Sequence, residues 1–146
     1  MLRHRAPKAY SLLEVVLASG ICATALVPAL ALLRDGVTLA DRVDARHLLL
    51  LYGVSKMEEH LAIVAAGWTE GTFTGSFAAE GHSNVRYIVV QSDEVASGGI
   101  VDRLMNVVVT TYRDEDGDAA LDADEMRNVM RTKIGRFTSY ENKAGG

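Results

Sequence analysis

The chain has 146 residues, of which 15 are basic and 19 acidic, so that its formal charge is −4. This length accommodates one domain with at most one long additional element, and the negative balance argues against a nucleic-acid-binding protein. The single cysteine, Cys22, excludes an intramolecular disulfide. We expect Cys22 to be a small packing residue rather than a reactive thiol.

The amino-terminal part reads as a membrane-spanning helix behind a short basic leader. Residues 1–9 contain Arg3, Arg5 and Lys8, and no charged residue occurs from Val15 to Leu33. As a helix this apolar run covers roughly 28 Å, about one bilayer core. Because basic flanks stay on the cytoplasmic side, residues 10–33 are predicted to span a membrane once, with the amino terminus inside. Pro28 should kink this span or weaken its local hydrogen bonding, which a span tolerates.

One carboxylate, Glu14, lies at the head of the apolar run. Its burial in hydrocarbon would cost roughly 2.5–3.5 kcal/mol if it were deep, and less near the interface, so it needs a partner. The basic leader, the small Ala9, the aromatic Tyr10 and Glu14 four residues later resemble the prepilin-type signal of type IV pilins and type II secretion pseudopilins. The chain departs from that signal in having Ala9 for the usual Gly and Tyr10 for the usual Phe.

The resemblance implies that a prepilin peptidase cuts between Ala9 and Tyr10 and that Tyr10 is N-methylated. It also implies that the positive amine of one mature subunit meets the Glu14 carboxylate of its neighbour, which would offset the burial of both charges. The implied protein is a filament subunit of the bacterial inner membrane, with its globular domain in the periplasm. The implied partners are other pseudopilins or pilins, membrane lipid and the inner-membrane secretion platform.

An ordinary secretory signal peptide is the alternative for the same stretch. Ala29-Leu30-Ala31 and Ala23-Thr24-Ala25 both have the small-x-small pattern of a signal peptidase site. The length of the apolar run and the acid at its start favour the prepilin interpretation. Under the alternative, the chain would be an exported or membrane-anchored Ca²⁺-binding module.

Residues 34–67 are predicted to continue the helix as an amphipathic half that ends at Gly67. Charged residues recur between apolar residues that follow helical spacing, and Gly36 and Gly53 are weak points in the helix. The predicted apolar stripe consists of Val43, Leu50, Val54, Met57, Leu61 and Val64. Such a stripe must be covered, and a small β-sheet is the available cover.

Residues 68–146 are predicted to form that sheet, as a domain on the periplasmic side. Strands are expected at Thr72–Phe77, Val85–Gln91, Leu104–Tyr112 and Asn128–Phe137, with turns at Gly81–Asn84 and Ser97–Gly99. The mixed charge of the fourth strand suits an edge. Trp68 should be a packing anchor, and Ser139–Gly146 a frayed tail. The fold class is therefore α+β, a long helix on an antiparallel sheet, as the resemblance to pilins also implies.

The tetrapeptide Lys56-Met57-Glu58-Glu59, late in the helix, is most similar to the minor pseudopilin I of type II secretion or to the related minor pilin V. That similarity implies a minor subunit of the filament.

The acidic segment 114–125 follows the register of an EF-hand loop. Side-chain ligands for Ca²⁺ would come from Asp114, Asp116, Asp118, Asp122 and Glu125, and a backbone ligand from the carbonyl of Ala120. Two features depart from the motif: Ala119 occupies the place where the sharp turn uses Gly, and strands rather than helices flank the loop. A solvated acidic hairpin loop is the alternative interpretation.

No catalytic constellation is evident. The four histidines lie in the leader, on the helix and in a turn, and no nucleophile elbow, phosphate-binding loop or cysteine-rich metal motif occurs. We therefore expect the histidines to be surface or packing residues and the protein not to be an enzyme.

Overall fold

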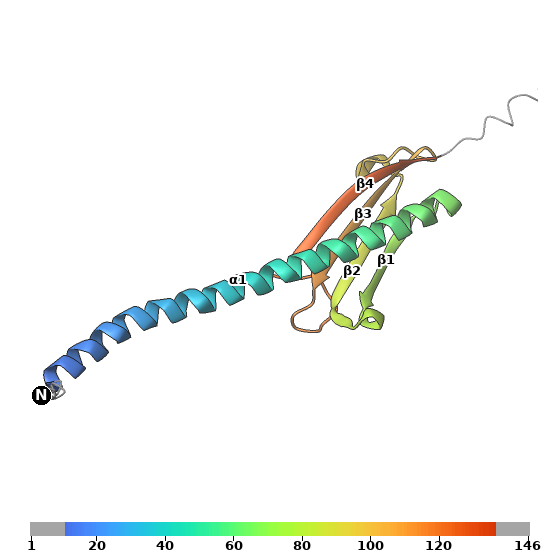
Figure 1. Ribbon diagram of the computed structural model, residues 1–146. Coiled ribbons are helices and arrows are strands. Elements are labelled where there is room, and N and C mark those ends of the chain that lie inside the picture. The colour runs from blue at the N-terminus through green and yellow to red at the C-terminus, as the bar shows by residue number, and fades with distance from the viewer. Residues whose placement is uncertain (1–10, 137–146) are drawn as a thin grey trace, which may run out of the picture. The chain divides into compact units, whose positions relative to one another are not determined.

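The computed structural model describes residues 11–136, and the chain divides into two compact units, Met1–Val43 and Asp44–Gly146. One helix, α1 (Leu12–Gly67), has residues in both units and ends at the predicted residue (Figure 1). The predicted leader at residues 1–9 and the predicted tail Ser139–Gly146 lie outside the described residues.

In the first unit the described structure is helix alone. α1 continues through Pro28, and every side chain from residue 12 to residue 43 is exposed in the isolated chain. Cys22 is among them, so the described part of its own chain does not cover this side chain, and its role as a small packing residue stays a prediction. This part of α1 is long and apolar enough to cross a membrane, by length and composition.

The second unit contains a four-stranded antiparallel sheet in the order β1-β2-β3-β4, which confirms the α+β prediction (Figure 1). The strands are β1 (Gly71–Phe77), β2 (His82–Ser92), β3 (Leu104–Arg113) and β4 (Arg127–Gly135). Two short 3₁₀ turns, η1 (Ala78–Glu80) and η2 (Val95–Ser97), lie in the β1–β2 and β2–β3 connections. The last strand is an edge strand, as its mixed charge predicts.

The first turn differs from the prediction. The chain reverses at η1 and Gly81, whose φ of +88° closes the turn, and β2 already begins at His82. The predicted turn at Gly81–Asn84 is therefore wrong for its last three residues. Glycine adopts this left-handed backbone at no steric cost, so the reversal is complete at Gly81 and the polar residues after it can extend into the strand.

The helix face that meets the sheet also differs from the predicted stripe. The buried residues of α1 are Leu49, Gly53, Met57, His60 and Val64. Of the predicted stripe, Met57 and Val64 are buried and Leu61 is half-buried, whereas Val43, Leu50 and Val54 are 56%, 46% and 38% exposed. The prediction failed because it followed hydrophobicity, while two positions of the real contact face are a glycine and a histidine.

Gly53 is a place of close approach rather than a weak point. A Cβ at this position would lie 3.0 Å from Nδ2 of Asn128 and 3.1 Å from Sδ of Met130, both on β4. One turn earlier, the hydroxyl of Thr111 on β3 donates a hydrogen bond of 2.8 Å to the carbonyl of Leu49. The missing side chain thus lets the helix backbone approach β3 and β4 closely.

Two apolar clusters hold α1 on the sheet. The larger one contains Met57, Val64, Val89, Met105, Val107 and Val109. The smaller one contains Leu49, Phe77 and Val85, and Tyr52 stacks on the Phe77 ring with 4.0 Å between centroids. Burial of these side chains is the main stabilisation of the second unit.

Candidate functional site

The head of α1 is a capping box formed by Ser11 and Glu14. The backbone N–H of Ser11 donates to Oε2 of Glu14 over 3.1 Å, and the backbone N–H of Glu14 donates to Oγ of Ser11 over 3.2 Å. Ser and Glu at this spacing satisfy two N–H groups that the first turn of a helix leaves free. Glu14 therefore has a partner within its own chain. The predicted cleavage residues Ala9 and Tyr10 lie outside the described residues.

Behind Glu14 follows a continuous apolar surface. Large side chains from Leu12 to Leu33 are between 59% and 85% exposed in the isolated chain. Apolar patches of more than a few hundred Å² on a protein mark a surface that a membrane or another protein covers.

The acidic loop between β3 and β4 brings three of the predicted ligands together. Oxygen atoms of Asp114, Asp116 and Asp118 lie within 4.8 Å of one another. Asp114 is buried, and its carboxylate accepts from the backbone N–H groups of Gly117, over 2.7 Å, and Ala119, over 3.1 Å. The aspartates also order the following residues, since Asp116 accepts from the N–H of Asp118.

Ala119 adopts the backbone that the motif assigns to glycine. Its φ is +69°, so the sharp turn of the loop is present although a side chain replaces Gly at that place. This left-handed conformation is uncommon for a residue with a Cβ. The phenol of Tyr112 donates to the carbonyl of Ala119 over 3.1 Å, which ties the turn to β3.

The other two predicted side-chain ligands are not part of the same group. Glu125 accepts from the backbone N–H of Glu115 through Oε1, over 3.0 Å, and from that of Asp122 through Oε2, over 3.1 Å, so it closes the loop. Asp122 and Glu125 line a pocket of about 70 Å³ together with Glu115, Asp116 and Asp124. The negative charge of Asp118 raises the pKa of Asp122, which shows the repulsion within the loop.

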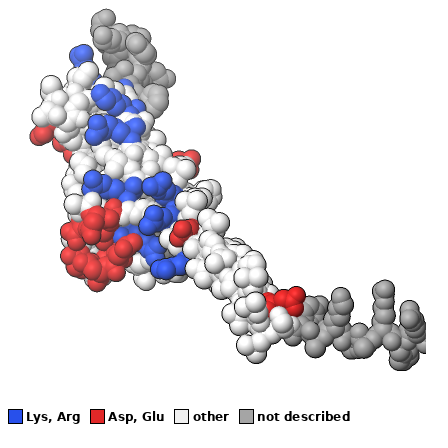
Figure 2. Space-filling model, turned by 90° about the vertical axis from the view of Figure 1, so that its left-hand side faces the viewer, with Lys and Arg blue, Asp and Glu red and all other residues white. Residues whose placement is uncertain are grey.

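The donor set is the kind that Ca²⁺ binds. All the side-chain groups are carboxylates, which are hard oxygen ligands. Asp114, Asp116 and Asp118 would hold the ion. The predicted backbone ligand, the carbonyl of Ala120, follows them in the sequence. Figure 2 shows the acidic side chains gathered in one dense group beside a band of lysine and arginine side chains.

Asp93 anchors the β2–β3 connection and was not anticipated from the sequence. Its Oδ2 accepts from Nε1 of Trp68 over 3.0 Å and from the backbone N–H of Asp102 over 2.7 Å. Both hydrogen bonds lower the pKa of Asp93, and the bond from Asp102 has the larger effect. Gly99 packs so closely against the backbone of Asp93 that no Cβ would fit there. The sequence signal for such an acceptor was Trp68, just after the helix, because the indole N–H of a partly buried Trp needs a hydrogen-bond partner.

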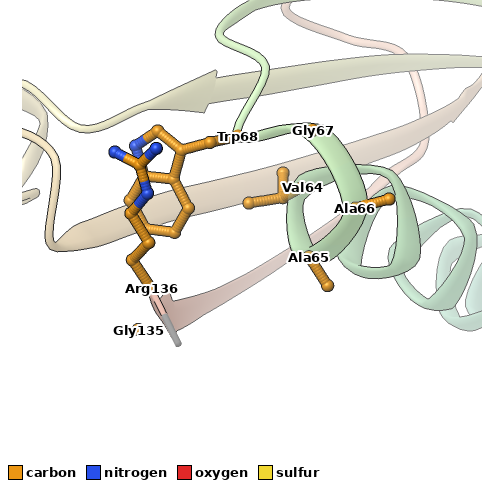
Figure 3. Close-up of a pocket in the computed structure, with 7 residues that line it drawn as sticks. All are labelled: Val64, Ala65, Ala66, Gly67, Trp68, Gly135 and Arg136. Carbon is orange, nitrogen blue, oxygen red and sulfur yellow. The ribbon is translucent and has the colours of Figure 1, made fainter. Parts of the chain in front are cut away.

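Trp68 is half-buried against the larger core cluster, which confirms its prediction as a packing anchor. Its ring also lines a pocket of about 200 Å³ at the end of α1 (Figure 3). The guanidinium of Arg136 lies 5.5 Å from the centre of a Trp68 ring and pairs with Asp102 over 3.0 Å. One part of the pocket lining is thus a cation that lies over an indole ring.

The described histidines agree with the prediction that they are surface or packing residues. His60 is buried, and its Nδ1 lies 2.8 Å from the side-chain nitrogen of Gln91 on β2. Burial lowers the pKa of His60. His47 is exposed, and His82 lies with its ring 5.6 Å from that of Tyr52. His4 lies outside the described residues.

Comparison of the chain with models of protein families, with curated protein sequences and with solved structures gives no match.

Proposed function

We propose that this chain is a subunit of an envelope filament of the type IV pilin and type II secretion pseudopilin class. A prepilin peptidase would remove residues 1–9 and methylate the amine of Tyr10. The apolar half of α1 would hold the subunit in the bacterial inner membrane, with the globular unit in the periplasm, until the secretion platform recruits it. The protein acts by assembly rather than by catalysis, and the tetrapeptide at Lys56 favours a minor pseudopilin.

The observation that carries the proposal is the position of Glu14. A single carboxylate stands at the head of a helix that has no further charge until Arg34. The capping bond occupies one lone pair of Oε2, and a carboxylate offers several more. Glu14 can therefore cap its own helix and still accept a hydrogen bond from the ammonium group of a neighbouring Tyr10. In a low-dielectric environment such a pair stabilises both charges.

The surface of α1 supports packing between subunits. Beyond the apolar span, the side of the helix that does not face the sheet still exposes large apolar residues, at Leu50, Leu51, Val54 and Ile63. The isolated chain leaves these side chains in water, whereas a bundle of like helices would cover them.

The substitution Glu14→Gln separates assembly from capping. Glutamine also serves at this position of a capping box but carries no charge. We expect Glu14→Gln and Glu14→Ala to insert into the membrane normally and to lose cross-linking to neighbouring subunits through the exposed Cys22. Ser11→Ala is the matched control, because it weakens the cap alone and should still assemble. Normal cross-linking of Glu14→Gln would contradict the proposed role of the charge.

A second candidate function is an exported or membrane-anchored Ca²⁺-binding module. The grouping of Asp114, Asp116 and Asp118 at a turn with positive φ favours it. Under this function the apolar stretch serves for export, and the mature chain would begin at Leu32, after Ala31. The two functions therefore differ in the amino terminus of the mature protein.

A further inference from the structure

The side of the sheet that faces away from α1 carries a row of cations on β4. Burial alternates along this strand: Met130 and Ile134 pack toward the core, and Arg127, Val129, Arg131 and Lys133 point the other way and are exposed. Alternate residues of a strand lie roughly 6–7 Å apart, so the cations form a line. Among residues 11–136 none of these three cations forms an ion pair.

Beside the cations the same face is apolar. The register of the sheet places Val90 of β2 opposite Val108 of β3, and Val108 opposite Arg131. Val90 is 38% exposed and Val129 is 53% exposed. We name this surface the basic face; it consists of Arg127, Val129, Arg131, Lys133 and Val90. A partner for it must combine negative charge with apolar groups.

The acidic loop has the complementary chemistry. Glu115, Asp116, Asp118, Asp122 and Asp124 are exposed, and alanines and the half-buried Leu121 alternate with them. Within the described chain the only ion pair of this loop joins Asp114 to Arg86, over 3.6 Å. The carboxylates of Asp114 and Glu125 accept hydrogen bonds from the loop backbone, and the phenol of Tyr112 donates one to it, so a partner would dock on an ordered surface at little entropic cost. Figure 2 shows a dense group of acidic side chains and, beside it, a band of basic side chains on the same side of the molecule.

We propose that the basic face binds the acidic loop of a second copy of this chain. Both surfaces belong to the same chain, and the loop makes no ion pair with its own β4. Because the two surfaces differ, one copy can contribute its loop and the other its basic face, so neither surface has to be self-complementary. The inference deepens the proposed function, on which it rests, by naming the contact between the globular units of two neighbouring copies of this chain.

The test uses the full-length chain in membranes, with Cys22→Ser to remove the natural thiol. Two differently tagged copies are co-produced, one with Ala123→Cys in the loop and one with Val129→Cys on β4. They are treated with a short bis-maleimide in a buffer with EGTA, so that no bound cation masks the loop. A product that contains both tags is expected. Arg131→Glu with Lys133→Glu should lower its yield about fivefold or more, because attraction becomes repulsion.

Charge exchange and a matched control make this result specific. Asp116→Lys with Asp118→Lys on the loop copy should restore the yield lost through the β4 reversal. Arg103→Glu changes an exposed arginine outside the basic face and should leave the yield unchanged. A rise in NaCl should lower the yield, since exposed charges are screened. A product that joins Val129→Cys to a different polypeptide would overturn the choice of a second copy.

Cross-linking of the unmodified chain through Cys22 distinguishes this inference from the proposed function. If Cys22 joins neighbouring helices while Ala123→Cys and Val129→Cys form no product, the loop contact is wrong and the filament function stands. If neither product forms, both proposals fail.

Discussion

Two adjacent leucines of α1 give a sharp test of the helix face that meets the sheet. Leu49 is 1% exposed and packs on Phe77 and Val85, whereas Leu50 is 46% exposed. Truncation of a fully buried leucine to alanine costs about 3 kcal/mol, because apolar contact is lost and a cavity remains. Leu49→Ala should therefore lower Tm by about 12–24 °C in a domain of this size. Leu50→Ala should cost at most about 1 kcal/mol, since half of its side chain is already in water.

Trp68 provides the assay, because it is the one tryptophan of the chain and packs against the core of the second unit. Thermal unfolding of the detergent-solubilised full-length chain would be followed by its emission. Both variants replace a leucine of the same helix by alanine, so the change in helix propensity cancels in the comparison. If Leu50→Ala lowers Tm as much as Leu49→Ala, the contact face is the one predicted from hydrophobicity and the reasoning is refuted.

Three further predictions concern titration, metal binding and the Asp93 anchor. Burial holds the pKa of His60 below its ordinary 6.5, so the unfolded chain takes up the proton first as pH falls. The contribution of His60 to the free energy of unfolding should thus be complete above about pH 6.5 and should decline as the pH falls from there to the folded pKa. His60→Gln should remove this decline in thermal scans. Millimolar Ca²⁺ should raise Tm, and its binding should give a heat signal in calorimetry. The double variant Asp116→Asn with Asp118→Asn should abolish both effects, whereas the control Glu94→Gln should keep them. No heat with the unaltered chain would exclude the site. Asp93→Ala removes the acceptor of two hydrogen bonds and should lower Tm and shift Trp68 emission to the red, whereas an unchanged spectrum would mean that the indole N–H has no need of this carboxylate.

The strands were predictable because their signals are local. β2 and β3 are runs of β-branched and aromatic residues between glycine-containing turns, and β4 alternates charged and apolar side chains, which is typical of an edge with one face buried. The end of α1 at Gly67 was predictable for the same reason, since glycine ends helices by a local backbone preference.

The helix face was not predictable from hydrophobicity, because it depends on tertiary contact. Gly53 lies on this face only because Asn128 and Met130 fill the space where a Cβ would be, and His60 lies on it because Gln91 offers a hydrogen-bond partner. All three partners are distant in sequence from the helix residues that they contact. The more apolar Leu50 and Val54 remain exposed, which is the expected result if other subunits cover them.

The acidic loop shows how far a motif predicts geometry. The spacing of Asp114, Asp116 and Asp118 predicted their grouping, and the structure has it. The motif assigns the sharp turn to a glycine, and Ala119 makes the turn with a positive φ although it carries a side chain. The motif did not predict that both carboxylate oxygens of Glu125 would accept hydrogen bonds from backbone N–H groups. The carboxylate of Asp114 holds this turn, because it accepts hydrogen bonds from the backbone N–H groups of Gly117 and Ala119.

The amino terminus of the mature protein, isolated from membranes of the natural host, tests the central claim most directly. Mass spectrometry of the first peptide should find Tyr10 as the first residue, with one added methyl group on its amine and the whole apolar helix retained. A mature chain that begins at Leu32 would have lost Glu14 and most of the span, and would contradict the filament function.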